Sequence, residues 1–234
     1  MISEFLINVS DNQINDLHKR IQQTRWPDEI NDQYWSHGTK MSFLKDLSKY
    51  WVDEFNWKDQ EKKINDIGSF KFKTNSGLSI HFLYAKSDHK DAVPLVMTHG
   101  WPGSIQEFIK IIPIIQQESK TPVDIICPSL PGFGFSDKPK STGMNSKEIA
   151  KLQHELVMAL GYKKYVVQGG DWGATVSKWM AELFPDYCVG IHLNLVIAFP
   201  PEGENPMDGV TDHELAMLEN YNKYKENGFG YYEI

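Results

Sequence analysis

The sequence predicts an α/β fold in which helices flank a mostly parallel sheet. From residue 93 onward, short apolar runs typical of strands alternate with helix-like stretches, the pattern of right-handed βαβ units. Because such units place helices on both sides of the sheet, its strands are expected to be covered on both faces. The first 90 residues read differently, since they are polar, rich in aromatic residues and mostly helical.

The composition is that of an ordinary globular protein. The chain has 234 residues, of which 41% are hydrophobic and 24% charged. A net charge of −7 and the lack of a dense Lys/Arg run argue against nucleic acid as a partner. No apolar run approaches the ~18 residues of a transmembrane span, and the first residues lack a signal-peptide pattern. Two cysteines in apolar runs, Cys127 and Cys188, indicate buried free thiols, so we expect a cytoplasmic protein.

Three helices are expected in the first region, residues 1–90. Ser10 and Gln13 resemble a capping box, and apolar residues then recur at helical spacing up to the break before Trp26-Pro27. A second helix is expected at 41–55 and a third at 57–64.

A strand pair should close this region. Strands are expected at 69–74 and 78–85, and residues 75–77 (Asn-Ser-Gly) between them are a good hairpin signal.

The second region, residues 91–200, carries the α/β alternation. The expected strands lie at 94–98, 123–127, 165–168 and 189–195, and the expected helices at 105–117, 146–160 and 175–184. We expect Pro113 to interrupt the first of these helices late in its course. A third region, 201–234, begins after a Phe-Pro-Pro step with a loop and a helix at 211–224.

Asp171 is the most informative residue. It lies in the segment 169–174 (Gly-Gly-Asp-Trp-Gly-Ala), between an apolar strand and a helix. A strand, a tight turn and a helix with small residues at the crowded positions form a nucleophile elbow, where the usual nucleophile is serine. A carboxylate at this place attacks carbon and leaves an alkyl ester, which points to opening of an epoxide or displacement of a halide.

The segment 99–103 (His-Gly-Trp-Pro-Gly) closes the strand at 94–98 and is the second strong motif. In a hydrolase of this architecture, one oxyanion-hole N–H comes from this loop and one from the residue after the nucleophile. The candidates are the backbone N–H groups of Trp101 and Trp172. A cis bond before Pro102 would aim Trp101 inward.

The glycine-containing loop at 128–139 lies at the carboxyl edge of the sheet, where it is expected to line a substrate pocket. It lacks the helix and the acidic partner that a dinucleotide-binding loop requires. We expect His99, Pro102 and Phe133 to belong to this pocket.

The base that would activate water is hard to place. The expected chain order is nucleophile, acid and then histidine, but only His192 and His213 follow Asp171. His192 lies inside a predicted strand, where a structural role is expected, and His213 opens a predicted helix, where a surface or capping role is expected. We therefore expect the base to be absent from this chain.

Three motifs together resemble the epoxide hydrolases of the α/β-hydrolase fold, in their microsomal and juvenile-hormone type. These motifs are 99–103, the loop 131–136 (Pro-Gly-Phe-Gly-Phe-Ser) and 169–173. The segment 24–28 (Thr-Arg-Trp-Pro-Asp) and the aromatic residues near 50–57 resemble the N-terminal region of that group. The resemblance extends over essentially the whole chain.

The resemblance implies a set of roles. Asp171 would attack an epoxide carbon of a small apolar substrate, with the amides of Trp101 and Trp172 as the oxyanion hole. Lid tyrosines would protonate the epoxide oxygen, and Tyr231 in a Gly-Tyr step is the candidate, with Tyr232 as the second choice. No cofactor and no metal are implied.

The resemblance also implies departures. Relatives continue beyond residue 234, so the rest of the lid, the last strands, the acid and its histidine are expected to be missing. The sheet would then end at 189–195 with an open edge, through which the chain could self-associate. Two alternatives stay open: a hydrolase similar to haloalkane dehalogenases, which share the Asp-Trp step, and an inactive fragment that keeps only the nucleophile and the oxyanion hole.

Overall fold

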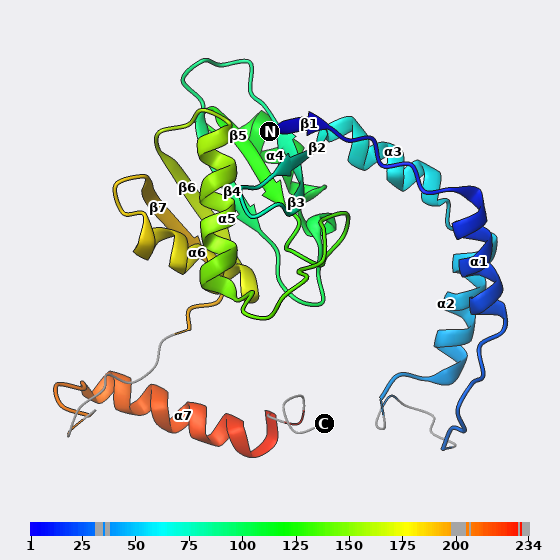
Figure 1. Ribbon diagram of the computed structural model, residues 1–234. Helices are drawn as coiled ribbons and strands as arrows, with labels where there is room; N and C mark the ends of the chain where they lie inside the picture. Colours follow the sequence, from blue (N-terminus) through cyan, green and yellow to red (C-terminus); the bar gives the residue numbers. More distant parts are fainter. Residues whose placement is uncertain (31–34, 36–37, 198–204, 206, 229, 231–234) are drawn as a thin grey trace. The chain divides into compact units, whose positions relative to one another are not determined.

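The computed structural model describes residues 1–30, 35, 38–197, 205, 207–228 and 230 (Figure 1). The chain divides into two compact units, Met1–Val196 and Ile197–Ile234. In the second unit, the described residues include helix α7 (Asp212–Gly228), close to the helix predicted at 211–224. In the part of the chain that the structure describes, no helix has the length and apolar character to cross a membrane.

In the described part of the first unit, seven strands form one mixed sheet in the order β1-β2-β3-β5-β4-β6-β7. The strands are β1 (Ile2–Glu4), β2 (Ser69–Lys73), β3 (Ser79–Ala85), β4 (Val93–Thr98), β5 (Val123–Pro128), β6 (Tyr165–Gly169) and β7 (Cys188–Leu193). β1, β2, β3 and β5 pair antiparallel in turn, whereas β5, β4, β6 and β7 pair in parallel. The predicted hairpin and the predicted parallel strands are both confirmed.

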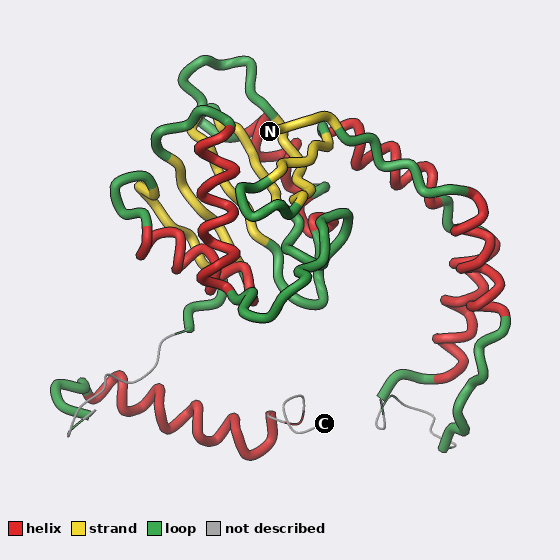
Figure 2. Tube along the Cα trace, viewed as in Figure 1, coloured by secondary structure: helices red, strands yellow, loops and turns green. Residues whose placement is uncertain are grey.

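Helices cover both faces of this sheet (Figures 1 and 2). On one face, α5 (Ser146–Ala159) and α6 (Trp172–Leu183) pack on a cluster that includes Val96 and Ile126. On the other face, the 3-10 helix η1 (Ile105–Phe108) and α4 (Ile111–Glu118) pack on a cluster that includes Met97 and Cys127. Adjacent strand residues therefore enter opposite cores, as the period of two in a strand requires.

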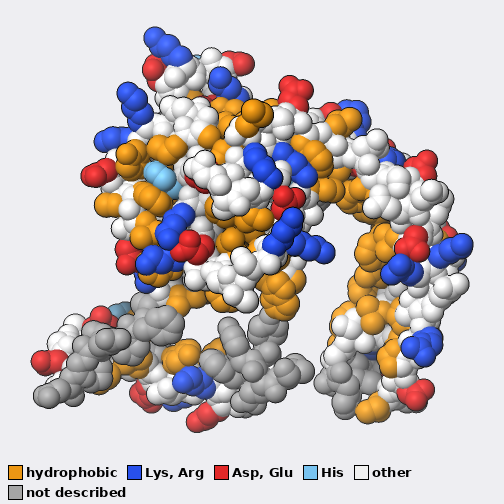
Figure 3. All heavy atoms as spheres, in the orientation of Figure 1, with side chains coloured by type: hydrophobic (Ala, Val, Ile, Leu, Met, Phe, Trp, Pro, Cys, Tyr) orange, Lys and Arg blue, Asp and Glu red, His pale blue; other side chains and the backbone are white. Residues whose placement is uncertain are grey.

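Three helices stand before the second strand: α1 (Asp11–Gln22), α2 (Met41–Asp53) and α3 (Trp57–Ile67). The predicted capping box is present, because the Ser10 and Gln13 side chains each accept from the other residue's backbone N–H. α1 and α2 contact each other, and hydrophobic side chains remain exposed along this pair (Figure 3). The buried Glu61 carboxylate of α3 accepts from Val9 N–H at 2.7 Å and so ties α3 to the chain before α1.

The structure corrects three details of the predicted elements. The break in the helix predicted at 105–117 falls at Ile109 and Lys110, and Pro113 lies in the first turn of α4. A proline is tolerated there because the first-turn N–H groups have no partner within the helix. α6 begins at Trp172, three residues earlier than predicted, and β1 was not predicted at all.

Candidate active site

The turn between β6 and α6 holds Asp171 in an uncommon backbone conformation. Its φ of 51° and ψ of −129° place it in the positive-φ region, and it is the one non-glycine residue there among those described. Such a conformation costs on the order of 1–3 kcal/mol and tends to occur at functional sites. The turn presents the carboxylate of Asp171 at the carboxyl end of β6, as a nucleophile elbow does.

Close backbone packing holds the elbow in place. A Cβ on Gly173 would lie 2.0 Å from the Thr98 carbonyl oxygen at the end of β4. A Cβ on Gly169 would lie 2.1 Å from the carbonyl oxygen of Gly173. Both obstacles are backbone atoms, so the absence of a side chain allows α6 to begin against the ends of β4 and β6.

The loop after β4 supplies a hydrogen bond to Asp171. The backbone N–H of Trp101 donates to Asp171 Oδ1 at 2.7 Å, a short distance typical of a charge-assisted bond. The peptide bond between Trp101 and Pro102 is cis, and the Trp101 indole lines the cavity described below. The hydrogen bond joins the two motifs that were predicted to form the site, the loop at 99–103 and the elbow at 169–174.

His99 lies behind this loop and is only 1% exposed. Its Nε2 accepts from Leu130 N–H at 3.1 Å, so the Nδ1 hydrogen is the one that faces the Gly100 carbonyl oxygen at 2.9 Å. Burial lowers the pKa of the imidazole, and the bond to Gly100 only partly offsets this effect. With both nitrogens engaged, neutral His99 joins the loop after β4 to the loop after β5.

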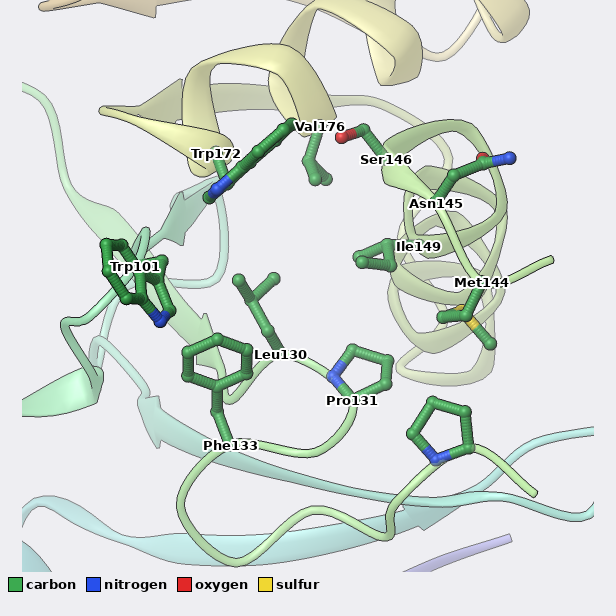
Figure 4. A pocket seen from close by; sticks show the side chains of 11 residues that line it. Trp101, Leu130, Pro131, Phe133, Met144, Asn145, Ser146, Ile149, Trp172 and Val176 are labelled. Carbon is green, nitrogen blue, oxygen red and sulfur yellow. The ribbon is translucent and has the colours of Figure 1, made fainter. Parts of the chain in front are cut away.

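A cavity of about 430 Å³ opens next to the elbow, since Trp172, which follows Asp171, is part of its lining. Figure 4 shows the side chains that line it. Its walls are formed by Trp101, Leu130, Pro131, Phe133, Pro139, Met144, Asn145, Ser146, Ile149, Trp172 and Val176. The lining side chains carry no charge and are mostly apolar. Trp101 and Trp172 are 55% and 56% exposed, which is unusual for tryptophan and leaves the two indoles free to contact a ligand.

The structure brings four of the predicted site residues together. Asp171, Trp101, Trp172 and Phe133 lie at the elbow or line the cavity beside it. His99 and Pro102, which were also expected in the pocket, are not among the side chains that line this cavity: His99 is buried behind the loop, and Pro102 is exposed after the cis bond. Tyr231, and Tyr232 as second choice, lie outside the described residues.

The two histidines that follow Asp171 are both exposed. His192 is in strand β7, where a structural role was expected, and His213 is in the first turn of α7, where a surface or capping role was expected.

Sequence reasoning missed one wall of the cavity and one neighbour of the elbow. The wall is Met144 to Ile149, at the start of α5. Its signal was available, because α5 follows the loop at 128–139 that was expected to line a pocket. The neighbour is Asn194, whose Oδ1 would lie 2.3 Å from a Cβ on Gly170. It follows β7 directly, and the end of a parallel strand beside the elbow was a usable signal.

Comparison with known proteins shows which families the chain resembles. Residues 2–108 match the family described as epoxide hydrolase N terminus, and residues 93–214 match the alpha/beta hydrolase fold family. Epoxide hydrolase 1 of Oryctolagus cuniculus is 38% identical over 206 residues, covering 84% of this chain and 45% of that protein. The chain spans about half the length of the curated relatives it matches.

Solved structures agree as well. The crystal structure of juvenile hormone epoxide hydrolase from the silkworm Bombyx mori has a TM-score of 0.77 at 35% identity, over 83% of this chain and 53% of that chain. The Aspergillus niger epoxide hydrolase has a TM-score of 0.82 at 27% identity, over 99% of this chain and 62% of that one. The chain therefore belongs to the α/β-hydrolase fold family, among the epoxide hydrolases that carry the epoxide hydrolase N terminus.

Proposed function

We propose that Asp171 opens an epoxide by forming an alkyl-enzyme ester. The observation that carries this proposal is the 2.7 Å hydrogen bond from Trp101 N–H to one oxygen of a carboxylate at the elbow. That bond leaves the other oxygen to attack. The attack forms a bond from Asp171 to an epoxide carbon, the ring C–O bond breaks, and the electron pair goes to the epoxide oxygen, which then takes a proton. Tyr231 stays the candidate donor of that proton.

The oxyanion hole belongs to the second half-reaction. When water attacks the ester carbonyl carbon, the negative charge develops on the Asp171 oxygen that already accepts from Trp101 N–H. Trp172 is the residue after the nucleophile, and we assign its backbone N–H as the second donor. Collapse of this intermediate would restore the carboxylate and release a vicinal diol.

The substrate class follows from the cavity. Its uncharged, mostly apolar lining and its volume of about 430 Å³ suit a small apolar epoxide. The indoles of Trp101 and Trp172 would contact the apolar part of such a molecule, while the amides of Asn145 and the hydroxyl of Ser146 add polar groups to one wall.

We expect the ester to accumulate in the 234-residue chain. A proton acceptor is needed to activate water. His99 is engaged through both ring nitrogens, and His192 and His213 are exposed on β7 and α7. With both nitrogens engaged, His99 is not free to act as that base, and we expect neither His192 nor His213 to serve as one.

Intact-mass spectrometry of the 234-residue chain with styrene oxide tests the proposal. We expect the mass to rise by one styrene oxide, peptide mapping to place the adduct on Asp171, and Asp171→Asn to abolish it. An unmodified wild-type protein would contradict the assignment of Asp171. Steady diol release would support Asp171 but overturn the expected accumulation. A parallel incubation with a primary alkyl bromide separates the alternative, because alkylation with bromide release but no reaction with styrene oxide would indicate a dehalogenase.

A further inference from the structure

A second carboxylate lies on the loop that carries Asp171's hydrogen-bond donor. Glu107 is in η1, one turn beyond this loop, and its side chain folds back over Gly103. A Cβ on Gly103 would lie 1.7 Å from Glu107 Oε1. Gly103 has no positive φ, so what its lack of a side chain provides is space for the Glu107 carboxylate in this position and not a special backbone conformation.

Asp171 lies against the other end of the same loop. A Cβ on Gly100 would lie 2.3 Å from Asp171 Oδ1, and the carbonyl oxygen of Gly100 would lie 3.3 Å from a Cβ on Gly103. The two glycines therefore admit two carboxylates to one loop of four residues. Burial raises the pKa of Glu107, and the charge of Asp171 raises it further, against a lowering by the Ser104 backbone.

Asp171 is the charged neighbour that affects the pKa of Glu107. Its negative charge raises the pKa of this carboxylate. His99, behind the loop, is neutral, and the residues that line the cavity are uncharged. Ser104 caps η1 with its side chain, and a hydrogen bond with the Ser104 backbone lowers the pKa of Glu107.

We infer that Glu107 is a positioning residue that speeds the alkylation of Asp171 through like-charge repulsion. The inference rests on the proposed function. Before reaction, two negative carboxylates face one loop. Alkylation turns Asp171 into a neutral ester and moves its charge to the epoxide oxygen on the substrate side, where a proton then neutralises it. Repulsion that is present in the reactant and relieved along the reaction lowers the barrier.

The test follows the rate of Asp171 ester formation with styrene oxide over a range of pH, by intact mass. We expect Glu107→Gln to slow alkylation by roughly twofold to fivefold at neutral pH, the range for partly exposed charges. The difference should vanish in acid, where wild-type Glu107 takes up its proton, and it should do so above the ordinary glutamate value of 4.5 because its pKa is raised. Glu118→Gln, the same change at the end of α4, should leave the profile unchanged.

The variant Gly103→Ala tests the role of the Glu107 carboxylate independently. The new methyl group would displace the flexible carboxyl end of Glu107 without removing its charge, and we expect the same slowing as in Glu107→Gln. The variant also decides the matter if Glu107→Gln does not fold. Parallel pH profiles for the wild type and both variants would overturn the inference while leaving Asp171 as the nucleophile. A wild-type protein that forms no adduct would instead count against the proposed function.

Discussion

Burial shifts the pKa of individual side chains in this chain, and His81 in β3 is the clearest case. Its side chain is fully buried, with Nε2 at 3.0 Å from Ser69 Oγ and Nδ1 at 2.8 Å from Ser129 Oγ. Burial, with a smaller effect from the charge of Lys71, lowers the pKa of His81 to about 4. A neutral ring thus links β2 and β3 to the loop that follows β5.

The folded protein should therefore lose stability in mild acid. The unfolded chain takes up a proton at His81 near pH 6.5, whereas the folded chain does so only near pH 4. The contribution is complete above the first value and is lost as pH falls towards the second, by on the order of 3 kcal/mol. Urea unfolding across this range measures it, and His81→Gln should flatten the pH dependence.

The exposed His89 supplies the control for this experiment. His89→Gln should leave the acid loss intact, since the imidazole of His89 lies at the surface. If His81→Gln keeps the wild-type slope between the two pH values, another group is responsible for the acid sensitivity.

At the scale of elements, a polar network joins the antiparallel and parallel halves of the sheet. Tyr162, just after α5, donates to the buried Asp124 carboxylate of β5, and its hydroxyl lies 2.6 Å from the hydroxyl of Tyr84 in β3. Burial together with both partners raises the pKa of Tyr162, so the hydroxyl keeps its proton. Asp124 also accepts from Ser87 N–H at 2.7 Å.

Removing the central hydroxyl should weaken this junction. We expect Tyr162→Phe to lower the free energy of unfolding by about 1.5–3 kcal/mol, because a buried carboxylate loses a donor. Tyr84→Phe is the matched control and should cost about 1 kcal/mol, since its hydroxyl bonds only to a neutral partner. Equal losses in urea titrations of the two variants would show that the charge on Asp124 does not set the energy.

The sequence predicted elements well where the signal was local. The capping box of Ser10 and Gln13 lies within four residues, and it marked the start of α1 correctly. β1 was missed because its pairing is remote: Ile2 lies opposite Phe72, and three residues carry no period that can be read. Pro113 misled because a proline permits a helix start as well as a helix break.

The residues of the site also separate into those that the sequence predicted and those that it did not. Asp171 and the loop of Trp101 could be predicted, because the elbow requires small residues at fixed places around the nucleophile. Asn194 was missed although its place at the end of a parallel strand was a usable signal, and Glu107 was missed because no pattern in the sequence shows that its side chain folds back over Gly103. The division into regions 1–90, 91–200 and 201–234 stays a prediction.

At the scale of the molecule, the edge of the sheet at β7 is where we expect copies of this chain to associate. Among the described residues, β7 pairs only with β6. Val189 and Ile191 on β7 are 54% and 46% exposed. An exposed strand with free backbone groups and apolar side chains is a template for further pairing.

We therefore predict association that grows with protein concentration, measured by light scattering after size-exclusion chromatography. Val189→Lys should suppress it, because a charge on an edge strand opposes pairing. Met217→Lys, an equally exposed apolar position on α7, should not. A wild-type chain that stays monomeric across the series would remove the edge as an interface.

The packing at the elbow also limits which of its glycines can be substituted. At Gly169 and Gly173 any side chain would meet a carbonyl oxygen of the main chain, which no rotamer change can move aside. At Gly170 the obstacle is the side chain of Asn194, which can turn away. A side chain at position 170 can therefore be accommodated if Asn194 turns aside, whereas a side chain at 169 or 173 would require the backbone itself to shift.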